Sequence, residues 1–235
     1  CAWHSIASNS DGHTWFPLRT ARAAIINSCG AAGVDVDRAI QLGTRSKWLA
    51  SFKDKQAGAW ITEAGKAQSE RDLAQKVYWL QSHETVLWPQ EGFEGLSEHQ
   101  RQQIIPILKS PIAVLAGTPG TGKTYSAAII LREIVKQCGR DGIAVCAPTG
   151  KAAVRISEAM SNYGLGLEAT TIHRRLGIGI GGDGFTFQFS ERNPLPYRVI
   201  VVDEASMLDT NLARCLFAAC SVGTHILLIG DPYQL

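Results

Sequence analysis

Ile112-Ala-Val-Leu-Ala116 runs directly into Gly117-Thr-Pro-Gly-Thr-Gly-Lys123-Thr124, and these residues determine which architecture the chain adopts. The first segment is a continuous apolar run, which is typical of a strand buried on both faces of a parallel sheet. The second segment fits the pattern GxxxxGK followed by Ser or Thr, and a helical pattern from Tyr125 to Gln137 comes next. A strand, a glycine-rich loop and a helix in this order predict a phosphate-binding loop.

The chemistry of this loop suits a nucleoside triphosphate with Mg²⁺. Glycines let successive backbone N–H groups curl around phosphate oxygens, and the helix N-terminus adds its positive end. Lys123 is long enough to reach the β- and γ-phosphates, and the Thr124 hydroxyl is a ligand for Mg²⁺. The alternative is a glycine-rich turn with a solvated lysine. The expected nucleotide-binding residues are Gly117, Thr118, Pro119, Gly120, Thr121, Gly122, Lys123 and Thr124.

Two carboxylates follow another apolar run, in the segment Val199-Ile-Val-Val-Asp203-Glu204. They emerge at the C-terminal end of the predicted strand, which is where ligands bind in open α/β sheets. Asp203 is suited to hold Mg²⁺ through water, and Glu204 to orient or deprotonate an attacking water. The pair is a weak signal in isolation and a strong one downstream of the phosphate loop.

From residue 96 onwards, apolar strand patterns alternate with helical patterns. This alternation predicts an α/β fold, a P-loop parallel sheet with helices on both faces. The expected strands are 112–116, 142–147, 198–202 and 225–229, and the expected helices are 125–137, 151–161 and 211–220.

Residues 1–90 have a different pattern, and we expect them to form a separate domain that precedes a second domain at 91–235. Helical patterns are followed by two short strands around the polar turn 53–58 and by a longer helix at 62–80. Two helices followed by a hairpin suggest a small, mostly helical, winged-helix-like module. It would serve either as a contact for DNA or a partner, or as an accessory scaffold. Residues 83–95 contain Pro and Gly and are expected to be a linker.

Composition limits the function classes. The chain has 235 residues, 45% of them hydrophobic, and its 23 Lys+Arg against 21 Asp+Glu leave a formal charge of +2. This balance argues against disorder and gives no global attraction to nucleic acid, so such binding would rest on local contacts. No apolar run is long enough to span a membrane, and no secretory signal is visible. The first residue is Cys1, so either the start is processed or the sequence is a piece of a longer protein.

The six cysteines form no CxxC pair. Several of them fall in apolar helix or strand patterns, which favours buried, reduced thiols in a cytoplasmic protein over a zinc site or a disulfide framework.

The motifs also carry a family resemblance. Over 96–235 the chain resembles the first motor domain of a RecD-like superfamily 1 DNA helicase, and it resembles the region preceding that motor more weakly over 12–82. The segments match motifs Q, I, Ia, Ib, II and III in order: Leu96-Ser-Glu-His-Gln100, the phosphate loop, Ala147-Pro-Thr-Gly-Lys-Ala-Ala153, Thr171-Ile-His-Arg-Arg-Leu176, Asp203-Glu-Ala-Ser-Met207 and Gly230-Asp-Pro-Tyr-Gln234-Leu235.

The resemblance implies a role for each matching residue. Gln100 would contact the adenine of ATP, the alternative being a polar residue at a helix start. Gln234 would sense the γ-phosphate and couple it to DNA, so the implied catalytic residues are Lys123, Asp203, Glu204 and Gln234. The implied contacts with single-stranded DNA are Pro148, Thr149, Lys151, Thr171, His173 and Arg174, with a core-facing His173 as the competing interpretation.

Residues 177–190 are first glycine-rich and then alternate, which predicts a hairpin. In the family an insertion here forms a pin beside the duplex fork, and a plain surface hairpin is the alternative.

The family's second RecA-like domain, with its arginine finger, does not follow motif III in this sequence. We therefore expect these residues alone to bind ATP weakly and to unwind little or no DNA.

The leading hypothesis is a fragment of an ATP-dependent DNA helicase that translocates 5′→3′ in its full-length form, with ATP and Mg²⁺ as cofactors. Single-stranded DNA and the duplex fork are the implied partners. The alternatives are a P-loop ATPase that acts on RNA or protein, and a non-catalytic nucleotide- or DNA-binding fragment.

Overall fold

A computed structural model describes residue 6 and residues 14–29, 33–83, 93–118, 120–181, 184–231 and 233–234. Contacts divide the chain into two units, one of residues 1–74 with 209–211, the other of residues 75–208 with 212–235. The division falls inside helix α4 (Ala64–Gln81), before the predicted boundary at residue 90. The second half of α4 belongs with the later unit because Leu80 is buried and Lys76 pairs with Glu191 at 3.6 Å. Most of the predicted linker, residues 84–92, lies outside the described residues.

The first unit combines two helices with a three-stranded antiparallel sheet. Its elements are β1 (Phe16–Pro17), α2 (Leu18–Cys29), α3 (Val36–Arg45), β2 (Leu49–Asp54) and β3 (Gly58–Glu63), with the strand order β1-β3-β2. Two helices followed by a hairpin are present as predicted, and β1 is an addition that pairs with β3. Asp35 caps α3 by accepting from the Arg38 backbone N–H at 3.1 Å.

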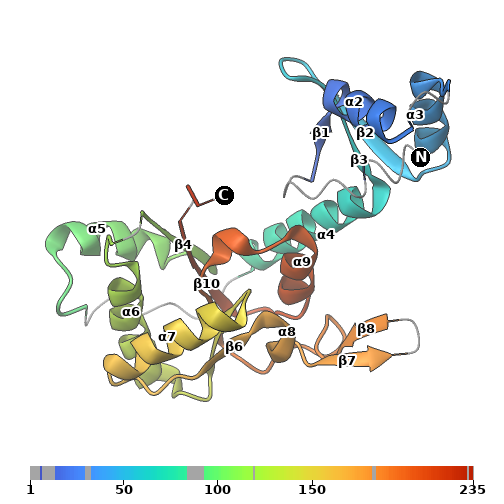
Figure 1. Cartoon of the computed structure of the whole chain (residues 1–235). Helices are drawn as coiled ribbons and strands as arrows, with labels where there is room; N and C mark the ends of the chain where they lie inside the picture. The colour runs from blue at the N-terminus through green and yellow to red at the C-terminus, as the bar shows by residue number, and fades with distance from the viewer. Residues whose placement is uncertain are drawn as a thin grey trace. The chain divides into compact units, whose positions relative to one another are not determined.

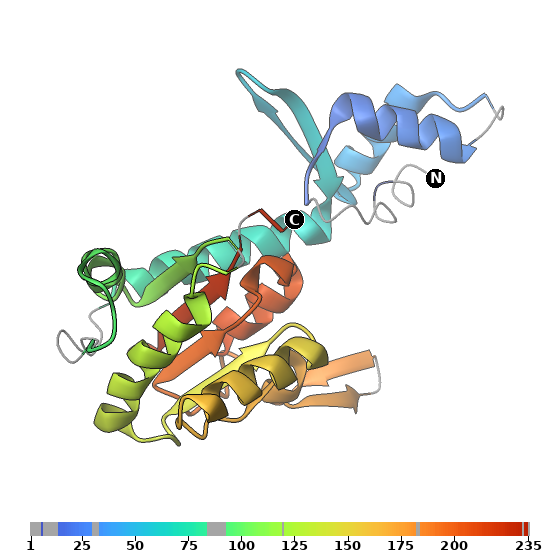
Figure 2. The same cartoon turned by 60° about the vertical axis from the view of Figure 1, so that its left-hand side comes forward.

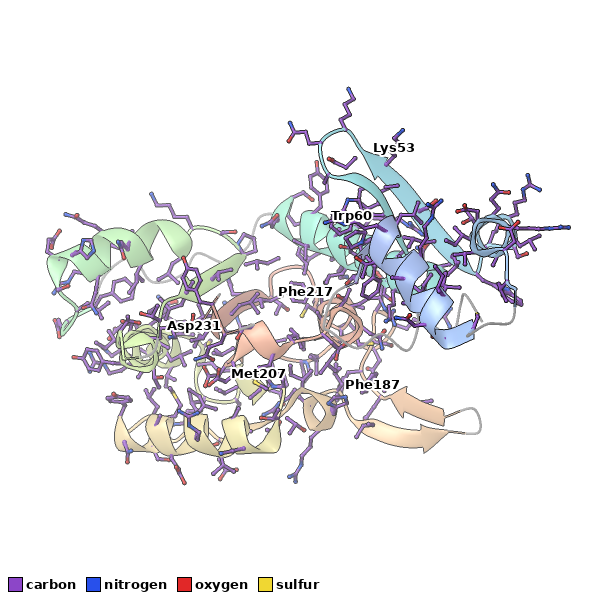
Figure 3. All side chains as sticks on the ribbon, turned by 45° about the horizontal axis from the view of Figure 1, so that its top comes forward. Lys53, Trp60, Phe187, Met207, Phe217 and Asp231 are labelled. Atoms are coloured by element: carbon purple, nitrogen blue, oxygen red, sulfur yellow. The ribbon has the colours of Figure 1, made fainter. Side chains whose placement is uncertain are left out.

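The first unit has its own apolar core. Phe16, Leu49 and Ile61 lie on one face of the small sheet and pack against α2, whose Ala21 and Ile25 are buried. On the other face, Phe52 stacks on Trp60 with ring centroids 6.4 Å apart. Figure 3 labels Trp60 of β3 and Lys53 of the neighbouring strand β2. Successive side chains of a strand point to opposite faces of the sheet, so the adjacent residues Trp60 and Ile61 of β3 lie on different faces.

The second unit is the expected α/β fold, which is confirmed. Its sheet is entirely parallel, in the order β4-β10-β9-β5-β6. The strands are β4 (Ile112–Ala116), β5 (Ile143–Ala147), β6 (Ala169–Thr171), β9 (Val199–Val202) and β10 (His225–Gly230) (Figure 1). Residues of β5 and β9 are buried throughout, as the unbroken apolar runs predict.

Helices cover both faces of this sheet. The helices α6 (Lys123–Cys138) and α7 (Gly150–Asn162) lie on one face and α9 (Thr210–Ala218) on the other (Figure 2). Crossovers from β4 through α6 to β5, and from β9 through α9 to β10, travel in opposite directions along the sheet. Right-handed crossovers therefore place α6 and α9 on opposite faces. The remaining elements are α5 (Glu98–Ile107), α8 (Ile172–Arg175), the 3-10 turn η1 (Ala205–Met207) and the hairpin β7 (Ile178–Gly181) and β8 (Gly184–Phe187).

No disulfide joins the described cysteines, and Cys146 and Cys220 are buried. None of the described helices is both long enough and apolar enough to cross a membrane.

Candidate nucleotide-binding site

The phosphate loop occupies the turn between β4 and α6. Gly120 and Gly122 have φ of 80° and 81°, a left-handed conformation that disfavours any residue with a Cβ. Nothing lies within 4 Å of the position that a Cβ would take at either glycine, so the loop is open on that side. The N-terminus of α6 follows directly, and the first backbone N–H groups of a helix, which have no partner within the helix, are the kind of donors that bind phosphate. Pro119, also predicted to bind nucleotide, lies outside the described residues.

Lys123 folds back over the loop. Its ammonium donates to the carbonyl oxygen of Gly117 and, at 2.9 Å, to that of Thr118. These carbonyls hold the positive charge at the mouth of the loop, where phosphate oxygens of a nucleotide would take their place. The loop is also joined to β10, because the Gly117 backbone N–H donates to the Gly230 carbonyl at 3.3 Å.

Asp203 and Glu204 emerge from the buried strand β9, as the sequence predicts. The backbone N–H of Asp203 donates to the Cys146 carbonyl of β5 at 2.9 Å, which anchors the end of the strand. Burial raises the pKa of Asp203 above its ordinary value, and the neighbouring Glu204 carboxylate acts in the same direction. A hydrogen bond from the Glu204 backbone and the positive charges of Arg155 and Lys123 act in the opposite direction.

Glu204 combines a strained backbone with an ion pair. Its φ of 52° is left-handed, although the residue carries a Cβ. Its carboxylate lies 3.7 Å from the guanidinium of Arg155 on α7, and only about a quarter of the Glu204 side chain is exposed. Strain of this kind persists only where surrounding structure compensates for it, and it is common at functional sites.

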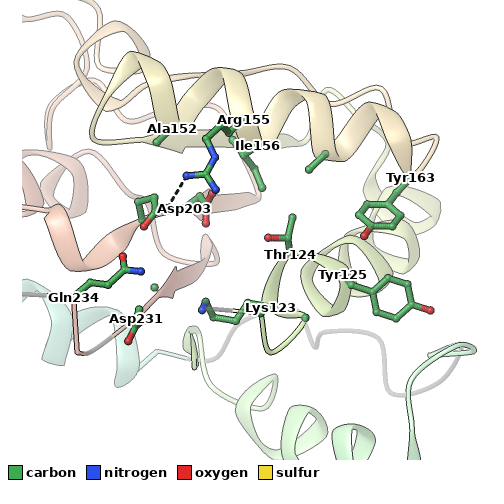
Figure 4. Close-up of a pocket in the computed structure, with 15 residues that line it drawn as sticks. Lys123, Thr124, Tyr125, Ala152, Arg155, Ile156, Tyr163, Asp203, Asp231 and Gln234 are labelled. Atoms are coloured by element: carbon green, nitrogen blue, oxygen red, sulfur yellow. Dashed lines mark ion pairs between the residues drawn. The ribbon is translucent and has the colours of Figure 1, made fainter. Parts of the chain in front are cut away.

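The pocket is bounded by the phosphate loop, by the residues that follow β9, and by the residues at the end of β10. A Cβ on Gly230 would lie 3.1 Å from the Ser206 backbone nitrogen, so glycine allows η1 to approach the strand closely. Asp231 is buried, and its carboxylate accepts from the Tyr233 backbone N–H at 2.9 Å. This turn brings Gln234 to the pocket (Figure 4).

These walls enclose a pocket of about 450 Å³. It brings together seven predicted site residues, while Gly117, Thr118 and Thr121 belong to the loop without lining the pocket. Its lining residues are Gly120, Gly122, Lys123, Thr124, Tyr125, Ala152, Arg155, Ile156, Ala159, Tyr163, Asp203, Glu204, Gly230, Asp231 and Gln234.

The donor set fits Mg²⁺. Thr124 and Asp203 both line the pocket with oxygen donors, which are the ligands Mg²⁺ prefers. Among the described residues there is no cluster of three or more His, Cys, Asp or Glu that would form a complete protein cage. Mg²⁺ commonly keeps several waters and binds through one or two protein oxygens plus phosphate, so this sparse set suffices.

The structure places Gln100 in a capping box at the start of α5. Its side-chain oxygen accepts from the Ser97 backbone N–H at 2.9 Å, and the Ser97 hydroxyl accepts from the Gln100 backbone N–H at 3.2 Å. Gln100 is not among the pocket-lining residues. This geometry matches the polar helix-start alternative, and the predicted adenine contact stays a prediction.

The residues predicted to contact DNA lie at and after the C-terminal ends of the neighbouring strands β5 and β6. Neighbouring strands β5 and β6 align Ala147 with Thr171, so the two motifs that follow them start side by side. Thr149 and Thr171 cap α7 and α8, accepting from the Ala152 and Arg174 backbone N–H groups, each at 3.2 Å. Pro148 lies next to Thr149, in the turn between β5 and α7.

The cationic side chains at this edge differ in exposure. Lys151 and Arg174 are exposed, whereas His173 is half-buried. The His173 ring lies 6.1 Å from the ring of Phe187 in the β7–β8 hairpin. His173 is therefore packed against Phe187 and also partly exposed. Both the predicted DNA contact and the core-facing alternative remain compatible with this position.

Sequence reasoning missed Arg155, Tyr125 and Tyr163. Arg155 belongs to a stripe on α7 with Ala152, Ile156 and Ala159, all of which line the pocket. The three- and four-residue spacing of that stripe is the signal that would have revealed it. No comparable signal marks the tyrosines, since Tyr125 and Tyr163 meet only through the packing of α6 and α7.

Comparisons with known proteins agree with the motifs. Residues 100–235 match the family model described as the AAA domain. The ATP-dependent RecD2 DNA helicase of Deinococcus radiodurans is 30% identical over 248 residues, 98% of this chain and 33% of that protein. The RecBCD enzyme subunit RecD of Mycobacterium tuberculosis is 38% identical over 157 residues, 60% of this chain and 27% of that protein. The chain thus spans about a third or less of the length of these curated relatives.

Among solved structures, the crystal structure of Pif1 helicase from Candida albicans aligns with a TM-score of 0.40 and 25% identity. The alignment covers 60% of this chain and 33% of that chain.

Proposed function

The chain belongs to the AAA domain family over residues 100–235, and on this premise we propose that it is the nucleotide-binding part of an ATP-dependent, RecD-like DNA helicase. One observation carries the proposal: Lys123, Thr124, Asp203, Glu204 and Gln234 converge on a single pocket from three different loops. Relatives named as a DNA helicase and as a RecBCD subunit support the choice of DNA as the substrate.

The pocket residues divide the work of hydrolysis. Lys123 exchanges its two carbonyl partners for β- and γ-phosphate oxygens, while the N–H groups at the start of α6 bind the remaining oxygens. Thr124 and Asp203 would hold Mg²⁺, which neutralises charge on the phosphates when it is bound. Glu204 accepts the proton of the attacking water, and Arg155 holds its carboxylate over the pocket.

Gln234 couples this site to DNA. It reaches the γ-phosphate end of the pocket from the turn after β10, so loss of that phosphate changes its contacts. Single-stranded DNA runs along the ends of β5 and β6, where Thr149, Lys151, Thr171 and Arg174 offer hydroxyl and cationic groups to backbone phosphates. In the full-length helicase, cycles of hydrolysis move DNA 5′→3′ past a second motor domain and towards the duplex fork.

A cytoplasmic location is part of this proposal. It is supported by the burial of the Cys146 and Cys220 side chains, which is typical of reduced cysteines that pack as small apolar residues.

The rate of ATP hydrolysis with and without single-stranded DNA tests the proposal. It is measured on this chain and on a longer protein that also carries a second motor domain. We expect hydrolysis that DNA stimulates only in the longer protein, because an arginine that its second motor domain supplies across the cleft contributes several orders of magnitude to turnover. Glu204→Gln in the longer protein should bind ATP normally and hydrolyse it slowly.

Two other functions are outcomes of the same assay. Equal stimulation by RNA of the same length, or by neither nucleic acid in either protein, would favour a P-loop ATPase acting on RNA or protein. ATP binding without turnover in the longer protein would favour a non-catalytic nucleotide- or DNA-binding module.

A further inference from the structure

The nucleotide pocket has two chemically different ends. At one end lie Asp203, Glu204 and Gln234, together with the buried Asp231. At the other end, beyond Lys123 and Thr124, the lining is aromatic and apolar (Figure 4). A nucleoside triphosphate has the same polarity, with charged phosphates at one end and a flat, mostly apolar base at the other.

Tyr125 and Tyr163 form the aromatic end. Tyr125 follows Thr124 directly at the start of α6, and Tyr163 is the residue at which α7 ends. Their ring centroids lie 5.7 Å apart in an edge-to-face arrangement with an interplanar angle of 61°. Both rings remain partly open, with 37% of Tyr125 and 44% of Tyr163 exposed.

Tyr125 is held in place by its hydroxyl. The phenol donates to the Gly95 carbonyl at 3.2 Å, which fixes the ring between the phosphate loop and the segment that leads into α5. A ring fixed in this way loses little further conformational freedom when a ligand stacks on it. The pocket therefore offers a preorganised aromatic surface two residues after Lys123, the residue proposed to bind the phosphates.

We propose that Tyr125 and Tyr163 form the nucleobase-binding end of the pocket, where one ring stacks on the base of the bound nucleotide and the other contacts the base with its edge. This inference rests on the proposed ATP-binding function, because the phosphate loop must first fix the triphosphate in the middle of the pocket. With the γ-phosphate directed at Glu204 and Gln234, the base is left at the tyrosine end.

This arrangement determines how well the pocket discriminates between the bases of different nucleotides. Stacking reads the π-face that every base possesses, whereas discrimination between adenine and guanine requires hydrogen bonds to the base edge. The neighbouring lining residues Ile156 and Ala159 offer no side-chain hydrogen bond, and Gln100 is not among the residues that line the pocket. The pocket should therefore accept purine triphosphates with similar affinity.

Equilibrium binding of ATP, GTP and inorganic tripolyphosphate to the chain tests the inference. Tyr163→Ala should weaken ATP and GTP binding by roughly 5- to 100-fold, the range of base–aromatic stacking, and should leave tripolyphosphate binding unchanged. Tyr125→Phe keeps the ring and should retain most of the affinity, while Tyr125→Ala should lose it. Tyr78→Ala is the matched control, since Tyr78 is an exposed tyrosine of α4 that does not line the pocket.

The outcomes separate the two proposals. Unchanged ATP affinity in Tyr163→Ala, or a parallel loss of ATP and tripolyphosphate, would overturn the base-stacking role. A wild-type chain that binds tripolyphosphate as tightly as ATP would overturn it too. A wild-type chain that binds neither would instead overturn the proposed ATP-binding function. Because the Tyr163 side chain is partly exposed at a helix end, its alanine variant keeps the test available if Tyr125→Ala fails to fold.

Discussion

At the scale of single residues, Lys123 is the most direct test of the phosphate loop. The hydrogen bonds of its ammonium go to two carbonyls of the same loop, Gly117 and Thr118, so removing the side chain breaks no hydrogen bond to another helix or strand. Lys123→Ala should weaken ATP·Mg²⁺ binding by roughly 10- to 100-fold, the equivalent of one or two charge-assisted hydrogen bonds. Fluorescence titration measures the affinity, and the melting temperature should stay close to that of the wild type. Unchanged affinity would mean that the loop is not the phosphate site.

Glu204 stores backbone strain, and glycine would release it. Its left-handed φ of 52° costs a residue with a Cβ about 1 kcal/mol or more. Glu204→Gly should therefore be more stable than Glu204→Ala by about 1 kcal/mol in urea unfolding. At Ala205, which starts the following 3-10 turn, Ala205→Gly should instead lower stability. If both glycine substitutions destabilise the chain equally, Glu204 carries no strain.

How far site residues can be predicted depends on how local their arrangement is. Lys123 and Thr124 act within one loop, and Asp203 and Glu204 follow one strand, so linear patterns identify them. Arg155 matters only because α7 packs with its pocket-facing stripe over the end of β9. Gln100 lies in a local motif that the sequence alone leaves ambiguous. A glutamine at this position fits both a contact with the base and a capping box, and the hydrogen bond from the Ser97 backbone in the structure corresponds to the capping box.

At the scale of helices and strands, Thr149 links stability to the proposed DNA path. Its hydroxyl caps α7, so Thr149→Ala should lower the free energy of unfolding by about 1 kcal/mol, whereas Thr149→Ser should not. Thr149→Asp keeps a capping oxygen and adds a negative charge. We expect near-normal stability and weaker binding of single-stranded DNA, measured by fluorescence anisotropy at fixed salt. Undiminished DNA binding by Thr149→Asp would remove this residue from the DNA path.

Elements were predictable where a periodic or unbroken apolar pattern was long enough. The strands β4, β5, β9 and β10 come from unbroken apolar runs, and each lies within a residue or so of its predicted bounds. The expected burial on both faces is wrong for β4, because it is an edge strand of the sheet and its Val114 is exposed. β6 was missed because its three residues, Ala169–Thr171, have no strand pattern of their own and are extended by pairing with β5. The two-residue β1 similarly exists through its pairing with β3.

At the scale of the whole chain, there are two apolar cores among the described residues. They correspond to the two regions that the sequence pattern distinguishes, the helices and hairpin of the first region and the alternating strands and helices of the second. One core lies between α2 and the small antiparallel sheet, and the other surrounds the parallel sheet and includes residues of α6 and α7. Ligand contacts proposed above belong entirely to the second core's unit. Nucleotide should therefore stabilise one unit and leave the other unchanged.

Thiol labelling tests this independence. Cys146 and Cys220 belong to the nucleotide-binding unit, where burial raises the pKa of each to about 12, so at about pH 8 they react only when that unit opens. Cys29 packs against the core of the first unit. ATP·Mg²⁺ at about 100-fold above its Kd should slow labelling of Cys146 and Cys220 by roughly 100-fold, because it binds only the closed state.

Labelling of Cys29, followed at the same time by mass spectrometry of its peptide, should keep its nucleotide-free rate. Lys123→Ala supplies the control, since weaker nucleotide binding should remove most of the protection at Cys146 and Cys220 at the same ATP concentration. Equal slowing at all three thiols would show that the two units open together, so that nucleotide bound in one also stabilises the other. Protection that persists undiminished in Lys123→Ala would place the nucleotide outside the phosphate loop.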